Sequence, residues 1–391
     1  MKIAIVGYGT AGQAAALFLA RDGHAIELFE RSPQLHPVGA GFLLQPTGLG
    51  VLDALGLGEA ALASGARIER LHGANAAGRL VMDMCYADLS ANSFGLGMTR
   101  GALFALLHAR CIDVAQIRTG TRIVAAPAGS RGLVDEAGTE YGPYDLIVVA
   151  DGSQSGLRAT SELVVRDPPY PWGAMWCLLP ADGWPYANEL RQRYDGTRRM
   201  LGVLPVGAHP GSDDSKRWLT FYYSLPGTHV DSFDMAALAQ LQRDVAQLWP
   251  ELAQRTQALV EPAQLNRARY RDVVLRRPWR ERTVFIGDAA HGMSPQLGQG
   301  VNMALLDAQA LAVALGTHAD IAGALAAYAR ERTRHVAIYQ TLSRWLTPLF
   351  QSDSRVLAPL RDTFFGPMGR LPFAKPQMLK ILAGTKRHWL R

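Results

Sequence analysis

Residues 2–21, KIAIVGYGTAGQAAALFLAR, decide the fold of this chain. The run opens with a short apolar segment, which is typical of a buried parallel strand. Gly7, Gly9 and Gly12 follow in the spacing G-x-G-x-x-G, and Ala14–Arg21 has the pattern of a helix. Glycines at these places permit a tight turn, let the backbone approach a pyrophosphate, and let the helix pack closely on the strand. The pattern predicts a dinucleotide-binding strand–turn–helix unit.

An acidic residue stands where such a unit needs one. A second apolar strand, Ala25–Phe29, ends at Glu30. A carboxylate in this place can accept hydrogen bonds from both ribose hydroxyls of a dinucleotide. A glycine turn beside a surface glutamate is the alternative, but strand, helix and acid together favour a nucleotide site. The residues expected in it are Gly7, Gly9, Thr10, Ala11, Gly12, Glu30 and Arg31. The motif by itself does not choose between FAD and NAD.

Composition places the chain among globular proteins. It has 391 residues, of which 48% are hydrophobic and 19% charged, and this length suits two lobes or one large composite domain. No apolar run has the length of a membrane span, and the N-terminus does not look like a signal peptide. The three cysteines are scattered, and no metal-binding spacing is found, so we expect no metal site and a cytoplasmic protein.

The positive charge is concentrated at the C-terminal end. The formal net charge is +6, and residues 361–391 hold seven Lys/Arg residues against one acid, Asp362. The rest of the chain is therefore formally neutral, which argues against a nucleic-acid-binding surface. A solvated basic segment is the expected role for these residues, and contact with an anionic membrane or a partner is the alternative. We expect a monomer or a homodimer.

Two further motifs lie far downstream, each directly after a buried-type strand. Asp151–Arg158 (DGSQSGLR) follows the strand-like Asp145–Ala150 and has the form D-G-x-x-S-x-x-R. Gly287–His291 (GDAAH) follows a second apolar strand, and Pro295–Asn302 (PQLGQGVN) then begins a strongly apolar helix. The order of the three motifs along the chain is more specific than any one of them.

With these motifs the chain resembles the group A FAD-dependent aromatic monooxygenases, of the para-hydroxybenzoate hydroxylase and salicylate hydroxylase-like fold. The resemblance implies an α/β fold. A Rossmann-like FAD-binding domain of the GR2 type would carry an inserted β-sheet substrate domain and C-terminal helices. We expect the FAD-binding domain in residues 1–163 and 271–340, the β-rich substrate domain in 164–270, and a helical segment in 341–391.

The resemblance also implies roles for cofactor-binding residues. The carboxylate of Asp288 would bind a ribityl hydroxyl of FAD, and the loop Gly298–Asn302 would lie beside the isoalloxazine ring. Arg100 matches an arginine that reaches the FAD phosphates, and Gly41 lies in a segment next to the flavin. Asp151 belongs to a motif linked with both FAD and NAD(P)H. The full set implied in this way is Gly41, Arg100, Asp151, Asp288, Pro295, Gly298, Gly300, Val301 and Asn302.

The activity that the resemblance implies is hydroxylation of an aromatic or conjugated small molecule. In this family NAD(P)H reduces FAD, and O2 then forms a C4a-hydroperoxide whose distal oxygen goes to the substrate. Two alternatives stay open. One is an FAD-dependent reductase or dehydrogenase of the geranylgeranyl-reductase type, without oxygen insertion. The other is a flavin-binding protein without turnover. The sequence contains no pattern that identifies a general base, so the catalytic residues stay unassigned.

The substrate is expected against the aromatic middle segment, because oxygen transfer needs a site that excludes water. We expect Trp172, Trp176, Met200 and Tyr222 on the substrate side, although ordinary sheet-core packing explains each of them as well. Arg191 and Tyr194 are candidates to hold a carboxylate or polarise a phenol. The sequence names neither the substrate nor the choice between NADH and NADPH.

Overall fold

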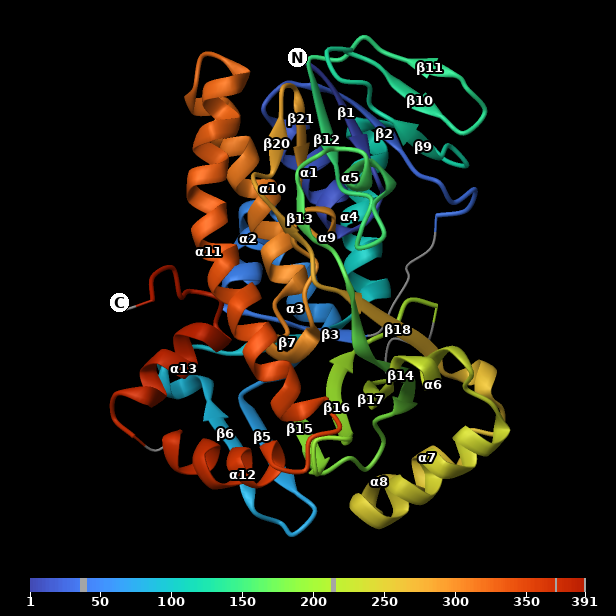
Figure 1. Ribbon diagram of the computed structural model, residues 1–391, viewed down its shortest axis with the longest axis vertical. Coiled ribbons are helices and arrows are strands. Elements are labelled where there is room, and N and C mark those ends of the chain that lie inside the picture. The colour runs from blue at the N-terminus through green and yellow to red at the C-terminus, as the bar shows by residue number, and fades with distance from the viewer. Residues whose placement is uncertain (36–40, 212–215, 370, 390–391) are drawn as a thin grey trace.

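Two large sheets organise the molecule. The computed structural model describes residues 1–35, 41–211, 216–369 and 371–389. A six-stranded sheet lies in the upper half of the molecule and a seven-stranded sheet in the lower half (Figure 1). This arrangement is the predicted α/β fold with a second β-sheet unit and C-terminal helices.

The six-stranded sheet has the parallel core of a doubly wound fold. Its neighbouring strands run parallel, except for the antiparallel pair at one edge. In order, the strands are β20 (Trp279–Arg280), β21 (Thr283–Phe285), β12 (Leu146–Val149), β1 (Lys2–Val6), β2 (Ala25–Phe29) and β8 (Ala115–Arg118). Strand β1 is central, and four of its five residues are buried, which explains its unbroken apolar run.

Each face of this sheet is covered. On one face, helices α1 (Thr10–Arg21), α4 (Arg100–Val114) and α10 (Gly300–Thr317) share one core with the strands. Ala14, Ala15 and Ala16 of α1 are fully buried there, and their small side chains let α10 approach closely. The other face packs against a ribbon that the sequence analysis did not predict. It consists of β9 (Ile123–Ala125), β10 (Leu133–Asp135) and β11 (Glu140–Tyr141).

The seven-stranded sheet is mostly antiparallel. In order, its strands are β18 (Asn266–Arg271), β14 (Pro169–Pro180), β17 (Trp218–Pro226), β16 (Arg199–Gly207), β15 (Glu189–Asp195), β5 (Arg70–Asn75) and β6 (Leu80–Cys85). One face shares a core with α7 (Met235–Leu248) and α8 (Pro250–Gln257). The opposite face packs on a small sheet of β3 (Gly41–Leu44), β7 (Gly95–Thr99) and β4 (Ala66–Ile68), so it is turned toward the six-stranded half.

This sheet draws strands from two parts of the chain. The segment 164–270, predicted as the substrate domain, supplies nearly all of β14 to β18. Strands β5 and β6 come from residues 70–85, which the sequence analysis assigned to the first FAD-binding part. The division of the chain into domains therefore remains a prediction.

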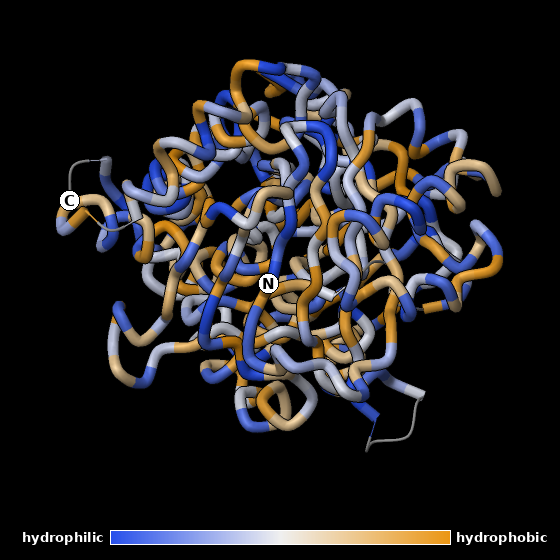
Figure 2. Tube along the Cα trace, turned by 90° about the horizontal axis from the view of Figure 1, so that it is seen from below, coloured by the Kyte–Doolittle hydropathy of each residue, from blue (hydrophilic) through white to orange (hydrophobic). Residues whose placement is uncertain are grey.

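The C-terminal part is helical. Helix α11 (Ile321–Phe350) runs from the upper half of the molecule to the lower half, and α12 (Leu357–Met368) and α13 (Ala374–Leu382) follow at the lower left (Figure 1). Viewed from below, the C-terminus lies at the edge of the outline (Figure 2). Within the described residues, α10 alone is long and apolar enough to span a membrane, and 67% of it is buried, as in a core helix.

Candidate active site

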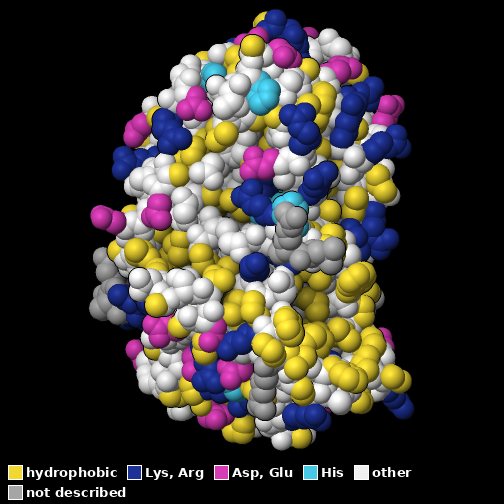
Figure 3. All heavy atoms as spheres, turned by 90° about the vertical axis from the view of Figure 1, so that its left-hand side faces the viewer, with side chains coloured by type: hydrophobic (Ala, Val, Ile, Leu, Met, Phe, Trp, Pro, Cys, Tyr) yellow, Lys and Arg dark blue, Asp and Glu magenta, His cyan; other side chains and the backbone are white. Residues whose placement is uncertain are grey.

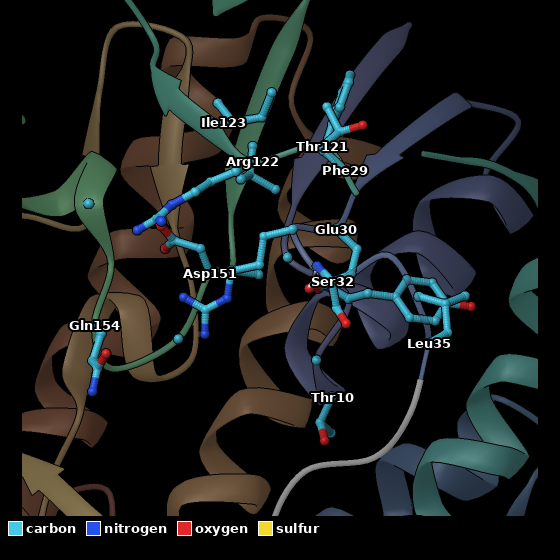
Figure 4. Close-up of a pocket in the computed structure, with 18 of the residues that line it drawn as sticks. Thr10, Phe29, Glu30, Ser32, Leu35, Thr121, Arg122, Ile123, Asp151 and Gln154 are labelled. Carbon is cyan, nitrogen blue, oxygen red and sulfur yellow. Dashed lines mark hydrogen bonds between the residues drawn. The ribbon is translucent and has the colours of Figure 1, made fainter. Parts of the chain in front are cut away.

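A large pocket opens at the carboxyl ends of parallel strands, where α/β sheets bind their ligands. It has a volume of about 590 Å³ and is formed where β1, β2 and β12 end. Figure 4 shows Thr10, Glu30 and Ser32 on one side of it, with Asp151 and Gln154 across the pocket. The glycine turn and the acid after β2 therefore lie in one cavity with the distant D-G motif.

The three glycines of the first turn meet different surroundings. Gly7 has φ +107°, which favours glycine, and an added Cβ there would lie 2.4 Å from the carbonyl oxygen of Ala150. A Cβ on Gly12 would lie 2.0 Å from the carbonyl oxygen of Gly7. A Cβ on Gly9 would meet no atom within 4 Å. Gly7 and Gly12 are thus required by the fold itself, whereas Gly9 leaves space at the pocket.

The carboxylate of Glu30 is held by the turn it faces. It accepts hydrogen bonds from the backbone N–H of Tyr8 at 2.9 Å and from that of Ser32 at 2.8 Å. Each oxygen keeps further lone pairs, so the fixed carboxylate can still accept bonds from a ligand in the pocket. Arg31 follows it and also lines the pocket.

Two aspartates from the distant motifs lie on the cofactor side. The Oδ1 atom of Asp151 is buried and has no hydrogen-bond partner among the described residues, and burial raises the pKa of this carboxyl group. Asp151 also lines the pocket. Asp288 begins the short helix α9 (Asp288–His291), is exposed, and has its Oδ1 3.9 Å from the position of a Cβ on Gly300. An unpartnered buried oxygen and an open carboxylate both suit a polar ligand.

Arg158 of the D-G motif has an internal role. Its side chain is 1% exposed and pairs with Asp167 at 2.9 Å. Its guanidinium also donates to the carbonyl oxygens of Gly152, Ser153 and Ala289. It therefore ties the loop after β12 to the loop after β21, and it does not point at the pocket as a free cation.

The loop before α10 is fixed to β3. The side chain of Asn302 is fully buried, accepts a hydrogen bond from the backbone N–H of Gln45 at 2.8 Å, and donates to the carbonyl oxygens of Leu43 and Gly298. Gly298 has φ +61° and open space around it. The loop residues predicted from the sequence, Pro295, Gly298, Gly300, Val301 and Asn302, therefore lie together beside β3.

Strand β17 holds Gly41 from the other side. The backbone N–H of Gly41 donates to Oγ1 of Thr220 at 3.1 Å, and the hydroxyl of Tyr222 donates to the carbonyl oxygen of the same residue. Residues at alternate positions of β17 share one face of the sheet, so Thr220 and Tyr222 both face the six-stranded half. The predicted cofactor segment at Gly41 and the predicted substrate residue Tyr222 are thus in contact.

A second tyrosine joins this group. Burial raises the pKa of Tyr222 far above its usual range and that of Tyr270 to about 12, and the positive charge of Arg100 lowers both. The phenols are therefore neutral near pH 7 and available as hydrogen-bond donors. Arg100 lies over the ring of Phe42, 6.0 Å from its centre, and also lines the pocket. Sequence reasoning missed Tyr270, because nothing in the β18 sequence marks its face.

The other predicted substrate residues divide into two groups. In the register of β14 and β17, Trp176 is the partner of Tyr222, and Trp172 lies an even number of residues away on the same strand. Both tryptophans therefore share the face of Tyr222, and Met200 on β16 lies on this face too. Arg191 lies on the opposite face, stacked on the ring of Tyr186 at 3.5 Å.

Tyr194 is fully buried against later helices. Its ring lies 5.2 Å from that of Phe350 and under the guanidinium of Arg361. The cross-strand register and the packing of α11 and α12 decide the positions of these two side chains. Neither can be predicted from the neighbouring residues in the sequence. We therefore withdraw Arg191 and Tyr194 as substrate contacts.

The pocket also contains residues that the sequence analysis did not name. Thr121, Arg122 and Ile123 line it from the start of the β9 ribbon (Figure 4). A three-residue strand carries no strong pattern, so the sequence held no signal for them. Among the described residues, no cluster of three or more His, Cys, Asp or Glu side chains could hold a metal ion.

A buried polar network lies behind the Gly287 turn. Asp307 on α10 accepts hydrogen bonds from the backbone N–H of Gly287 at 2.8 Å and from Nε of Arg332 at 2.7 Å, and it pairs with Nε2 of His291 at 2.5 Å. Burial opposes its ionisation, but the His291 and Arg332 partners hold its pKa far below the usual range. His291 thus supports the turn from inside and does not face the pocket.

Comparisons with known proteins agree with this geometry. A model of the family described as "FAD binding domain" matches residues 1–341. Kynurenine 3-monooxygenase of Salinispora tropica is 29% identical over 374 residues, which cover 88% of this chain and 78% of that protein. Aurachin C monooxygenase/isomerase of Stigmatella aurantiaca is 30% identical, with 84% of each chain covered. 3-Hydroxybenzoate 6-hydroxylase 1 of Aquipseudomonas alcaligenes is 27% identical, with 94% of each covered.

Solved structures show the same fold. HpxO of Klebsiella pneumoniae, complexed with FAD and uric acid, superposes with a TM-score of 0.81 at 22% identity, covering 98% of this chain and 96% of that one. The tetrameric form of 2-methyl-3-hydroxypyridine-5-carboxylic acid oxygenase superposes with a TM-score of 0.79 at 22% identity, covering 99% and 98%.

Proposed function

This chain belongs to the FAD-binding-domain family of group A aromatic monooxygenases, and from that premise we propose which residues hold the cofactor and where the substrate lies. The chain is an FAD-dependent oxidoreductase that uses NAD(P)H and O2 to hydroxylate an aromatic or conjugated small molecule. The relatives named above are monooxygenases and hydroxylases, so neither a reductase without oxygen insertion nor a flavin-binding protein without turnover is supported.

The residues present fit a bound FAD. The pocket beside Gly9 is open, the Oδ1 of Asp151 lacks a partner among the described residues, and the carboxylate of Asp288 is exposed beside Gly300. We assign the pyrophosphate to the glycine turn and the start of α1, the ribose to Glu30, and the ribityl chain to Asp288. Arg100 supplies the positive charge near the phosphates.

The chemistry that bound FAD supplies is acceptance of a hydride from NAD(P)H and activation of O2 for transfer of one oxygen atom. The chain's own residues bind and orient. The first turn of α10 presents backbone N–H groups and its positive end, which favour negative charge on a ring placed at the Gly298–Asn302 loop. A substrate bound on this partly exposed sheet face would displace water from it, and the neutral phenols of Tyr222 and Tyr270 can donate hydrogen bonds there.

We place the substrate between the Gly298–Asn302 loop and the sheet face of Tyr222. The contact between Tyr222 and Gly41 supports this, because it joins the sheet to the segment beside the flavin. Trp172, Trp176 and Met200 add apolar surface on the same face, which suits a flat conjugated ring. The names of the relatives point to small aromatic or purine substrates.

We propose a cytoplasmic location for the protein. The cysteines Cys85, Cys111 and Cys177 are all free, which suits the reducing cytoplasm. For assembly we propose a monomer or a homodimer, while a structural neighbour is described as tetrameric.

One observation supports the cofactor assignment. The glycine turn and the D-G motif line one pocket, and the third motif forms the loop before α10, although these motifs lie far apart in the sequence. A test is to purify the protein, record its flavin spectrum, and follow NADPH and NADH oxidation in air with a panel of aromatic acids, purines and quinolones. We expect slow basal oxidation that one substrate accelerates at least tenfold, with one hydroxylated product formed per NAD(P)H consumed.

The variant Asp288→Ala tests the ribityl contact. It should fold, since the carboxylate is exposed, and yet be purified with little flavin. Arg280→Lys, at a partly exposed ion pair away from the pocket, is the matched control. Full flavin content in Asp288→Ala would overturn the assignment of that residue. Failure of every reductant to bleach the bound flavin would overturn the monooxygenase activity.

A further inference from the structure

The C-terminal helices expose an unusual amount of apolar surface. Of the seventeen large hydrophobic side chains that are exposed in the described part of the chain, seven lie between Trp345 and Trp389. These seven include every exposed aromatic one. Monomeric soluble proteins normally scatter such side chains singly, and a gathered group marks a docking surface.

Helix α12 carries the centre of this surface. Val356, Leu360 and Phe364 are four residues apart, so they lie along one side of the helix, and they are 75%, 46% and 59% exposed. The inward side is already filled, because Arg361 is buried and Phe365 packs on Phe350. The outward apolar stripe is therefore not needed for folding of the helix onto the body of the protein.

The turn after α12 extends the surface outward. Leu371 and Phe373 are 54% and 87% exposed, with Pro372 between them and Pro376 shortly after. Nearby, the rings of Trp345 and Trp389 pack against each other 6.2 Å apart, and both are mostly exposed. We call Val356, Leu360, Phe364, Leu371 and Phe373 the C-terminal apolar patch. Figure 3 shows hydrophobic side chains gathered on the lower part of this face, over the C-terminal helices.

The segment that carries the patch is formally basic. Residues 354–391 contain eight Lys/Arg residues and one acid, Asp362. Asp362 is turned inward, where it accepts from Asn75 at 2.7 Å and pairs with Arg361 at 2.7 Å. Arg361 and Lys386 are buried, and Lys375 and Arg387 pair with Asp88 and Glu331 from outside the segment. With these two acids counted, the segment and its partners still keep a formal excess of positive charge.

We propose that the C-terminal apolar patch docks the protein onto an anionic lipid bilayer. Exposed aromatic and aliphatic side chains on a helix and a projecting turn enter the headgroup region, and basic residues beside them attract anionic lipids. Helices α12 and α13 lie at the lower left edge of the molecule, so a flat surface can reach them (Figure 1).

A second copy of the chain is a poorer occupant. A twofold interface brings the same surface of both copies together, and here it would place two basic segments face to face. Anionic lipids neutralise that charge instead. A nearly fully exposed Phe373 on a convex turn also suits insertion between lipids better than packing on a rigid surface.

The experiment uses the full chain loaded with FAD. Sucrose-loaded vesicles of phosphatidylcholine alone, or of phosphatidylcholine with an equal amount of phosphatidylglycerol, are pelleted with the protein at low and high salt. We expect binding to the anionic vesicles that weakens with salt by about fivefold for each basic residue engaged, and little binding to the neutral ones.

Variants locate the contact. Phe364→Ser with Phe373→Ser should lower vesicle affinity at least tenfold while flavin content and thermal unfolding stay unchanged. Met235→Ser with Val260→Ser removes exposed apolar side chains elsewhere (58% and 69% exposed) and is the matched control. Sedimentation of each protein alone gives its oligomeric state.

Three results would overturn the proposal. They are wild-type binding that does not depend on lipid charge, a patch variant that binds vesicles as the control does, and a wild-type dimer that the patch substitutions dissociate without any vesicle binding by the wild type. None of these results bears on the monooxygenase activity, which is measured separately by substrate-stimulated NAD(P)H oxidation.

Discussion

The glycines Gly9 and Gly12 belong to one turn, yet their neighbours constrain them differently. A Cβ on Gly12 would lie 2.0 Å from the carbonyl oxygen of Gly7, whereas a Cβ on Gly9 would enter open space at the pocket. The sequence motif already gives the two positions different roles, approach of the backbone to a pyrophosphate at Gly9 and close packing of the helix at Gly12. The structure therefore separates the glycine that the fold requires from the one whose space we assign to the cofactor.

We predict that Gly9→Val folds normally but loses FAD, because its side chain fills the space where a pyrophosphate would approach the backbone. Gly12→Ala should instead destabilise the cofactor-free protein by roughly 1–3 kcal/mol, since the backbone must move. The ratio of flavin to protein absorbance and thermal unfolding of the apoprotein measure the two effects. Gly50→Ala, at an open helical position, should alter neither beyond a slight gain in stability. Normal flavin content in Gly9→Val would contradict the cofactor assignment.

At the same scale, the position of Arg158 in the structure differs from the cofactor-facing position that its motif implies. Its position in D-G-x-x-S-x-x-R implied a link to NAD(P)H, but its side chain is buried on Asp167 and on loop carbonyl oxygens. The planar guanidinium serves several acceptors at once, which an ammonium group cannot do.

Arg158→Lys should therefore cost about 3–5 kcal/mol of unfolding free energy, because buried acceptors lose their partners. Urea unfolding of the two proteins checks this. Arg280→Lys, in an ion pair with the exposed Glu162, should change the unfolding free energy by less than about 1 kcal/mol. Equal small losses in both would show that Arg158 is not a structural clamp.

At the scale of elements, one polar network joins α10, α11 and the C-terminal segment. Arg332 links Asp307 on α10 to His335, and Nε2 of His335 donates to the carbonyl oxygen of Gly384 at 2.9 Å. Nδ1 of His335 accepts from Arg332, so the ring is neutral. Burial, and then the charge of Arg332, lower the pKa of His335 to about 4.

A pH dependence of stability follows from that shift. Between pH 6.5 and about 4 the unfolded chain binds a proton at this histidine and the folded protein does not, so stability falls as the pH falls through this window. The full effect is on the order of 3 kcal/mol.

His335→Gln should be less stable than the wild type at pH 7, and the difference should shrink toward pH 4. Urea midpoints at several pH values test this. The substitution His318→Gln, on an exposed side chain at the end of α10, is the control. Parallel pH profiles for wild type and His335→Gln would contradict the assignment.

At the scale of the whole molecule, the end of α13 contacts the loop before α10 and the start of α2 (Pro46–Ala54). Nε2 of Gln299 donates to the carbonyl oxygen of Leu382 at 2.6 Å, and Oγ1 of Thr47 donates to that of Ala383 at 3.1 Å. These contacts cross more than 80 residues of sequence, so the C-terminal segment is part of the site's framework.

Deletion of residues 370–391 should lower stability by at least about 3 kcal/mol and should weaken FAD binding, because it removes α13 with its buried Leu379 and Leu382 and the hydrogen bonds to Thr47, Gln299 and His335. Thermal unfolding and flavin titration measure this. Deletion of residues 388–391 alone keeps all three bonds and should leave both quantities unchanged. The same loss in both deletions would show that the last four residues carry the effect.

Expectations that depend on neighbouring residues were more accurate than those that depend on residues far apart in the sequence. The expected helix at Ala14–Arg21 lies within α1, because its signals are carried by adjacent residues. The expected strand Ala25–Phe29 has the bounds of β2 for the same reason. The β9 ribbon and the place of Tyr270 were not foreseen, because short strands and cross-strand partners leave little local pattern.

By itself, the sequence determined the dinucleotide unit, the order of the three motifs and the α/β class with an added sheet, because strand, turn and helix signals act over a few residues. Only the tertiary structure decided which face Arg191 and Tyr194 occupy, that Arg158 is an internal clamp, that β5 and β6 join the second sheet, and that an apolar patch stays uncovered on α12. These outcomes depend on side-chain partners far apart in the chain, and burial among such partners cannot be read from neighbouring residues.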